Sequence, residues 1–332
     1  MAIIYVKEQG AVIRKRGGRI LVEKDHKTLL EIPLRQTETV AVFGNVQVTT
    51  QALSELLERG IPLALFTRNG RLKGHLAPEA SKNIELRLHQ YRMAFDDAGS
   101  LEIAKRVVFA KLWNSSRVIA GYRSNYPSET LRRAEGSILD MAEKSKMAST
   151  LAELLGSEGA AAAAYFEAFR EMNRSEFPFE GRRKHPAPDP LNALLSFGYV
   201  LVTNEIRALA EGAGLEPHLG FLHRVDYGRP SLALDLLEPF RAILVDRLTL
   251  RLANERILKA EDFARRATGD RAGSVVLMPA ALDRYLARYE EAIEEPRKGA
   301  PDGIRRMLET EVAKLARALR ENCEFEPYRE GV

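Results

Sequence analysis

The chain has 332 residues, 45% of them hydrophobic and 29% charged, which is typical of a folded globular protein long enough for two domains. It has no run of about 18 or more uncharged apolar residues and no basic region ahead of a long apolar stretch at its start, so neither a membrane span nor a secretion signal is expected. The single cysteine, Cys323, excludes an internal disulfide framework and fits the reducing cytoplasm, where we expect the protein to act.

Positive charge is gathered in short clusters. The net charge is only +4, from 50 Lys and Arg against 46 Asp and Glu, which by itself is a weak argument for a nucleic-acid partner. The basic runs lie at 14–16, 132–133, 182–184 and 265–266. Most such runs are solvated surface, but their clustering favours a polyanionic partner.

Up to about residue 77 the pattern is that of β-strands. Strands are expected at 11–13, 20–22, 28–33 and 40–43, with a later hairpin at 61–66 and 71–76. Gly17-Gly18 suits the first hairpin turn and Asn69-Gly70 the last, and the segments at 28–33 and 40–43 are expected to continue a meander. A short helix over 51–59 is capped by Thr49 and Thr50 and closed by Gly60. We predict a small, mostly antiparallel sheet domain over residues 1–78.

From residue 80 onward apolar residues follow helical spacing. Helices are expected at 83–95, 101–122, 128–144, 160–172, 191–211, 231–254, 279–291 and 303–322. Pro239 falls inside one of them, so that helix is expected to kink or restart there. The fold class predicted is therefore α+β, with the sheet domain followed by a larger all-α domain over residues 79–332.

Two carboxylates in the helix at 231–254 stand out. Asp235 and Glu238 are three residues apart, which puts them on one face of a helix, and their neighbours are apolar enough for the segment to be buried. Two adjacent buried carboxylates repel, and one would stay protonated unless a cation lay between them. The alternative is an exposed Glu238 before Pro239 and an Asp235 that pairs with Arg241.

His223 and Glu158 are the other candidate ligands. His223 ends an apolar, strand-like stretch shortly before the carboxylate helix, although a lone histidine there is more often a satisfied core or loop residue. Glu158 follows Ser157 and is expected to start a helix, where its simplest role is in the helix dipole. Carboxylates with a single imidazole suit Mg²⁺ or Mn²⁺ better than structural Zn²⁺.

Together these segments resemble a known family. They are Glu-Gly-Ala-Ala with Tyr-Phe following, from Glu158, Asp-Pro-Leu-Asn-Ala-Leu-Leu-Ser-Phe-Gly-Tyr at 189–199, Gly-Phe-Leu-His at 220–223, and Arg-Pro-Ser-Leu-Ala-Leu-Asp-Leu-Leu-Glu-Pro-Phe-Arg at 229–241. They are similar to the CRISPR-associated protein one family, the integrase that inserts new spacers into CRISPR arrays. Tyr-Val-Lys-Glu-Gln-Gly near the start also looks like the family's sheet domain, so the resemblance spans nearly the whole chain.

The resemblance implies a site. Glu158, His223 and Glu238 would hold Mg²⁺ or Mn²⁺, with Asp235 beside them as a further acidic catalytic residue. Where other members carry aspartate at the last position this chain has Glu238, a longer arm of the same charge, and His185 in the basic loop is a second candidate imidazole. The expected DNA phosphate contacts are Arg182, Arg183, Arg224, Arg229 and Arg241.

The resemblance also implies a reaction and partners. The expected activity is that of a metal-dependent DNA endonuclease and integrase of CRISPR adaptation, which joins protospacer 3′-hydroxyl ends to the CRISPR repeat by phosphodiester transesterification. The sheet domains would form a homodimer, and a dimer of the small CRISPR-associated protein two would bridge two homodimers into a heterohexamer. No further domain is expected at either end.

Two other classes remain open at this stage. A metal-dependent nuclease would use the same ion with water as the nucleophile and would cut DNA without joining it. A non-catalytic DNA-binding scaffold would carry the acidic residues for structural reasons only.

Overall fold

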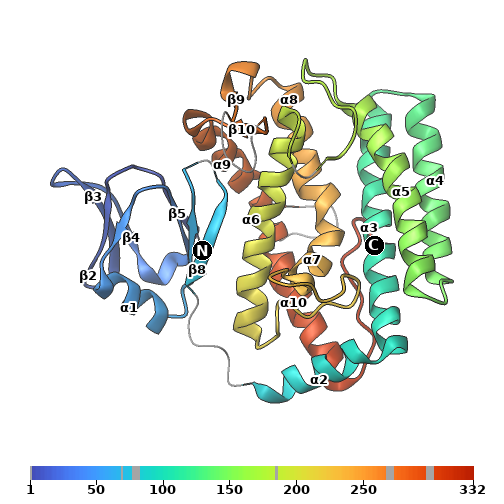
Figure 1. Cartoon of the computed structure of the whole chain (residues 1–332), viewed down its shortest axis with the longest axis horizontal. Helices are drawn as coiled ribbons and strands as arrows, with labels where there is room; N and C mark the ends of the chain where they lie inside the picture. Colours follow the sequence, from blue (N-terminus) through green and yellow to red (C-terminus); the bar gives the residue numbers. More distant parts are fainter. Residues whose placement is uncertain (1, 69, 77–82, 184–185, 267–272, 297–302) are drawn as a thin grey trace. The chain divides into compact units, whose positions relative to one another are not determined.

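The computed structural model describes residues 2–68, 70–76, 83–183, 186–266, 273–296 and 303–332. The chain divides into two compact units, an N-terminal unit of residues 1–82 and a C-terminal unit of residues 83–332. Figure 1 colours both along the sequence, and each is described here by itself. The predicted boundary between residues 78 and 79 lies outside the described residues, as does Asn69 of the expected turn.

The N-terminal unit holds two four-stranded sheets, with strand orders β1-β5-β7-β8 and β4-β3-β2-β6. Its elements are β1 (Ala2–Val6), β2 (Val12–Arg16), β3 (Arg19–Lys24), β4 (Lys27–Pro33), the 3₁₀ turn η1 (Leu34–Gln36), β5 (Thr37–Phe43), β6 (Gln47–Val48), α1 (Thr50–Glu58), β7 (Leu63–Phe66) and β8 (Leu72–Leu76). Both sheets mix parallel and antiparallel pairs.

The predicted hairpins of this unit are confirmed. β2 pairs with β3 in antiparallel register across Gly17, whose φ of +57° is the left-handed conformation that the turn requires. β7 and β8 form the second antiparallel hairpin. The predicted cap of α1 is confirmed as well, since the Thr49 hydroxyl accepts a hydrogen bond from the Ala52 amide at 3.3 Å.

The expectation that residues 40–43 continue the meander is wrong. β5 instead runs in the other sheet, parallel to β1 on one side and to β7 on the other. Val40 through Phe43 are all buried, which is the continuous apolar run of a central strand covered on both faces. A short apolar run of this kind predicts a strand, but the strands that pair with it are set by segments far away in the chain.

The C-terminal unit is mostly helical. Its elements are α2 (Ile84–Phe95), α3 (Asp97–Asn125), α4 (Glu129–Lys146), α5 (Leu151–Met172), α6 (Pro190–Ala213), α7 (Ser231–Leu237), the 3₁₀ turn η2 (Glu238–Phe240), the π-helix η3 (Arg241–Asp246), α8 (Arg247–Asn254), the 3₁₀ turn η4 (Ala260–Asp262), β9 (Phe263–Arg265), β10 (Val275–Leu277), α9 (Pro279–Glu294) and α10 (Ile304–Glu321). A β-sheet region followed by a mostly helical part confirms the predicted α+β class. The helical unit also contains the antiparallel hairpin β9–β10, which an all-α prediction omits.

Helix α5 begins earlier than predicted, so the expectation that Glu158 starts a helix is wrong. Thr150 caps α5, its hydroxyl accepting from the Glu153 amide at 3.2 Å, and Glu158 lies well inside the helix. Gly156 and Gly159 do not break it, although each glycine costs a helix roughly 1 kcal/mol. Packing against α3 and α4, visible side by side in Figure 1, offsets that local cost.

The predicted interruption at Pro239 is confirmed. The segment 231–254 passes from α7 through the 3₁₀ turn η2 to the π-helix η3 before it resumes as α8. A proline cannot supply the amide hydrogen of a regular helix, and π-helical turns occur frequently at functional sites. The 3₁₀ turn and the π-helix thus lie next to the predicted carboxylates Asp235 and Glu238.

Helix α6 is the apolar centre of the C-terminal unit. It is long and apolar enough to cross a membrane by length and composition, yet half of that stretch is buried within the protein. Its Glu205 accepts a hydrogen bond from the Tyr289 hydroxyl at 2.7 Å and lies 3.5 Å from the Arg305 guanidinium. Packing against α7 and α10 is that of a core helix.

Candidate active site

Three helical segments bring two of the predicted carboxylates onto one cation. Lys111 of α3 extends its ammonium nitrogen, Nζ, to Glu158 Oε1 of α5 in a close ion pair, and the same Nζ lies 2.8 Å from Glu238 Oε2 of η2. Glu158 and Glu238 thus meet, as the sequence predicted, but around a lysine that it did not single out. The only sequence signal for Lys111 is a charge next to apolar Ala110 and Leu112 within a helix.

Glu238 is buried and ionised. Its side chain is 1% exposed, Oε1 accepts a hydrogen bond from Arg241 Nη1 at 2.7 Å, and Oε2 faces Lys111 without the alignment of a hydrogen bond. Burial alone would raise the pKa of Glu238, but Arg241, Lys111 and His223 lower it below its usual range. The alternative of an exposed Glu238 and an Asp235–Arg241 pair is therefore wrong.

His223 is held in a defined tautomer. Its ring nitrogen Nδ1 lies 2.6 Å from Asp235 Oδ1, and since a carboxylate oxygen only accepts, we assign the proton to Nδ1. The other ring nitrogen, Nε2, lies 3.9 Å from Glu238 Oε1. Histidines that bind metals usually donate their second nitrogen to a carboxylate in this way.

Asp235 anchors the loop that carries His223. Its Oδ2 accepts the backbone amides of Phe221 at 2.6 Å and Leu222 at 2.9 Å, and its Oδ1 accepts the amide of His223 at 3.0 Å. The stretch expected to be strand-like is thus a loop folded around a buried carboxylate. Both oxygens are engaged, which is the bonding of a positioning residue. A direct catalytic role for Asp235 stays a prediction.

A second buried carboxylate, Asp246, is linked to the site through Tyr199 and Arg241. Asp246, at the end of the π-helix, accepts hydrogen bonds from the hydroxyls of Tyr199 at 2.5 Å and Tyr165 at 2.9 Å. Burial raises the pKa of Asp246 and, with Asp246 nearby, the pKa of both tyrosines. The Arg241 guanidinium carbon lies 4.3 Å from the Tyr199 ring centre, so the partner of Glu238 is itself fixed in place.

The five predicted phosphate contacts differ in their surroundings. Arg182 donates to Asn192 Oδ1 at 2.9 Å and to the Ser196 hydroxyl at 3.0 Å, and Arg241 is held by Glu238. Arg183 and Arg224 are exposed, and Arg229 is half-buried in the loop after His223. Lys184 and His185 lie outside the described residues, so His185 as a rival ligand stays a prediction.

The donor set fits a divalent cation. Glu158, Glu238 and Nε2 of His223 offer oxygen atoms and one imidazole, the ligand types that suit Mg²⁺ or Mn²⁺. In the described part of the chain, no three His, Cys, Asp or Glu side chains stand ready to ligate an ion as they are placed. The ammonium of Lys111 lies between the carboxylates of Glu158 and Glu238.

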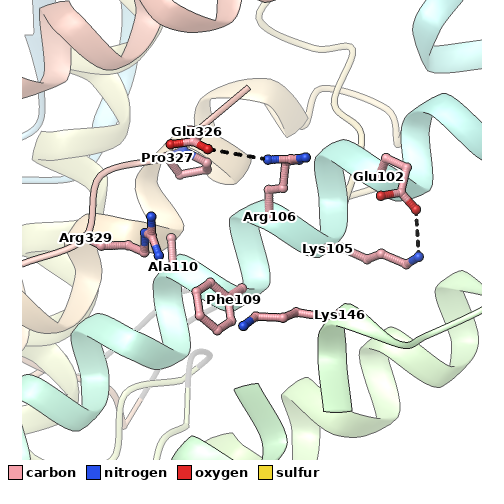
Figure 2. Close-up of a pocket in the computed structure, with 9 residues that line it drawn as sticks. All are labelled: Glu102, Lys105, Arg106, Phe109, Ala110, Lys146, Glu326, Pro327 and Arg329. Atoms are coloured by element: carbon pink, nitrogen blue, oxygen red, sulfur yellow. Dashed lines mark hydrogen bonds and ion pairs between the residues drawn. The ribbon is translucent and has the colours of Figure 1, made fainter. Parts of the chain in front are cut away.

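A separate hollow of about 290 Å³ lies on another side of α3 (Figure 2). It is lined by cations and by the ring of Phe109, but Lys105 pairs with Glu102 at 2.7 Å and Arg106 lies 4.0 Å from Glu326. The helical repeat of roughly 3.6 residues places Lys111 on the opposite side of α3 from Glu102. The hollow is therefore not part of the carboxylate site.

Comparison with known proteins identifies one family. The family model described as CRISPR associated protein Cas1 matches residues 4–291. A CRISPR-associated endonuclease Cas1 of Rhodospirillum rubrum is 34% identical over 98% of this chain and 96% of its own length. A Cas4/Cas1 fusion, exonuclease and endonuclease, of Geobacter sulfurreducens is also 34% identical, over 95% of this chain, and the chain spans 58% of the fusion's length.

Solved structures share the fold. A Cas1 protein from Thermotoga maritima has a TM-score of 0.81 at 24% identity, covering 100% of this chain and 99% of its own. A casposase bound to integration product has a TM-score of 0.83 at 23% identity, covering 98% of this chain and 93% of its own. A Cas6-RT-Cas1–Cas2 complex contains a chain with a TM-score of 0.84 at 22% identity, matched over 100% of this chain and 36% of that one.

Proposed function

The chain belongs to the Cas1 family of CRISPR-associated endonucleases, as the sequence resemblance indicated, and we propose that it is a metal-dependent DNA integrase of CRISPR adaptation. The proposed reaction joins the 3′-hydroxyl of a protospacer to a phosphate at the end of a CRISPR repeat. One phosphodiester bond forms and another breaks, and the repeat's own 3′-oxygen leaves. The observation that carries the proposal is that Lys111 joins Glu158 to Glu238, while Nε2 of His223 lies 3.9 Å from Glu238 Oε1.

Glu158, Glu238 and His223 are the residues that would hold Mg²⁺ or Mn²⁺. The bound ion would polarise the phosphoryl oxygen and stabilise the charge that develops on it. Asp235 binds Nδ1 of His223, which leaves Nε2, 3.9 Å from Glu238 Oε1, as the nitrogen that would bind the ion. Arg241 and Lys111 keep Glu238 ionised, as a ligand must be.

DNA contacts are proposed for the loop that follows His223. Arg224 and Arg229 lie a few residues beyond a site ligand, and Arg183 is exposed at the edge of the basic segment. These three are free of the buried partners that hold Arg182 and Arg241, so they are the better candidates for phosphate contacts.

The partners proposed are those implied by the family. A homodimer through the β-rich unit, joined by a dimer of the small CRISPR-associated protein two, would space two active sites at the ends of one repeat. Support comes from a solved neighbour that is a Cas1–Cas2 complex and from another that is bound to integration product. We propose the cytoplasm as the compartment, since the chain's single cysteine fits a reducing environment.

An integration assay tests this function. Purified protein, with and without the small partner, is incubated with Mn²⁺, a supercoiled plasmid carrying the CRISPR array, and a labelled duplex with free 3′-hydroxyl ends. We expect label to join the plasmid, and Glu158→Ala, His223→Ala and Glu238→Ala each to reduce joining about a hundredfold or more. Glu167→Ala, an exposed residue on the same helix as Glu158, is the matched control and should retain full activity.

The two alternative classes give different results in the same assay. Plasmid cutting without joining indicates a hydrolytic nuclease and contradicts the integrase. Joining or binding that is unchanged in all three variants, with normal folding, indicates that the acidic residues are structural.

A further inference from the structure

Lys111 holds the position between the two carboxylates of the candidate site. Its Nζ contacts Glu158 Oε1 and lies 2.8 Å from Glu238 Oε2, and its side chain is 15% exposed. We propose that Lys111 is a built-in counter-ion that keeps the metal-free site assembled and that a divalent metal must displace in order to bind. The inference rests on the proposed function, since it takes Glu158 and Glu238 as metal ligands.

The metal-free site needs such a cation. Glu238 is 1% exposed and Glu158 19% exposed, and two neighbouring carboxylates in these surroundings repel each other. Arg241 neutralises Glu238 through Oε1, whereas Lys111 approaches Oε2 and also reaches Glu158. Lys111 is thus the cation shared by both carboxylates, and it draws α3, α5 and η2 together.

A metal and the ammonium compete for the same oxygen atoms. A magnesium ion binds oxygen ligands at roughly 2.0–2.1 Å, and a second positive charge against those oxygens repels it. One of the neighbouring cations must therefore move when the metal binds.

Lys111 is the cation able to move. A lysine side chain is a flexible four-carbon stem ending in a compact charge, and it can turn away without any change in the backbone. Arg241 is restrained, because its guanidinium lies 4.3 Å from the Tyr199 ring centre and Tyr199 is fixed by its hydrogen bond to Asp246. The metal consequently gains Glu158 and Glu238 at the expense of the Lys111 ion pairs.

Removing the charge of Lys111 tests the competition directly. Lys111→Met should bind Mn²⁺ about tenfold to a hundredfold more tightly than the unsubstituted protein at one fixed pH, the range that a charge-assisted hydrogen bond is worth. In EDTA the same variant should melt at a lower temperature. Lys105→Met is the matched control, since Lys105 lies on α3, is also 15% exposed and pairs with Glu102 at 2.7 Å. It should leave Mn²⁺ affinity unchanged.

A second measurement needs no substitution, in case Lys111→Met does not fold. The full-length protein is labelled with an amine-reactive acetylating reagent with and without Mg²⁺, and labelling at each lysine is read by mass spectrometry. Displacement should raise the labelling rate of Lys111 severalfold when Mg²⁺ is present and leave that of Lys105 unchanged.

The outcomes separate this inference from the proposed function. If Glu158→Ala and Glu238→Ala abolish Mn²⁺ binding but Lys111→Met leaves it unchanged or weakens it, the counter-ion role is overturned and the metal site stands. Labelling of Lys111 that does not rise with Mg²⁺ overturns it equally. If the unsubstituted protein binds no Mn²⁺ through these glutamates, both the inference and the metal-dependent function fail.

Discussion

Replacing Asp235 by asparagine is the sharpest test of how the site is held together. Asp235 is 1% exposed, and its two oxygens accept three backbone amides and the His223 ring proton. Asparagine has nearly the same shape but presents one NH₂ group, which cannot accept. The substitution therefore changes hydrogen bonding while leaving packing almost intact.

The size of the effect follows from the geometry. If the NH₂ group takes the place of Oδ2, it faces the amides of Phe221 and Leu222. If it takes the place of Oδ1, it faces the amide and the Nδ1 proton of His223. Either way two donors lose their acceptor, and each such loss in a buried setting costs about 1–3 kcal/mol. We expect Asp235→Asn to lower the free energy of unfolding by about 2–6 kcal/mol.

Urea unfolding followed by circular dichroism at neutral pH measures this loss. The control is Asp226→Asn in the exposed part of the same loop, which should change stability by less than about 0.5 kcal/mol. A manganese titration on the folded fraction adds a second readout, because a misplaced His223 should weaken metal binding about tenfold to a hundredfold.

Two results would refute the anchoring role. Asp235→Asn that is as stable as the control shows that the loop does not depend on this carboxylate. A variant with normal stability and normal Mn²⁺ affinity but no joining activity shows instead that Asp235 acts directly in the reaction, as the sequence predicted.

Two further predictions concern Gly220 and Glu311. Gly220→Ala should destabilise the protein by about 1–3 kcal/mol in urea unfolding, since the added Cβ would lie 2.6 Å from Asp235 Oδ2 and 2.9 Å from the Ser231 carbonyl carbon. The control is Gly212→Ala, in open space on α6, which should be neutral or stabilising. Equal stability of the two variants would contradict the close approach at Gly220. Burial raises the pKa of Glu311 to about 8, so between its unfolded pKa near 4.5 and that value the folded protein holds a proton that the unfolded chain has lost. The free energy of unfolding should therefore fall as pH rises through this window, by up to about 1.4 kcal/mol per pH unit from this group. Glu311→Gln should remove that part of the slope. Identical slopes for the variant and the unsubstituted protein between pH 5.5 and 7.5 would show that Glu311 does not titrate there.

Local chemistry made several elements predictable. The hairpin across Gly17, the cap at Thr49 and the interruption at Pro239 all depend on residues within a few positions of one another. The pairing of Asp235 with Glu238 on one face follows equally from the helical repeat. Their burial could be read from the apolar neighbours, because a segment apolar almost all round has no solvent face.

Other features depend on contacts between distant segments. Helix α5 begins at Leu151 rather than near Glu158 because α3 and α4 pack against it, although local propensity disfavours Gly156 and Gly159 within a helix. β5 has the same apolar pattern whichever strands lie beside it, so its place between β1 and β7 was not predictable.

The amino-acid sequence by itself determined the family and the α+β class, and it predicted which acidic residues and which histidine form the candidate site, since these depend on residue type, order and short-range spacing. Only the tertiary structure decided how those groups divide their work. In the folded protein Asp235 binds the loop that carries His223, and Glu238 pairs with Arg241. Lys111 of α3 lies between Glu158 and Glu238. A charge buried in a protein must be compensated, but which distant side chain does so is settled by the packing of helices that are far apart in the chain.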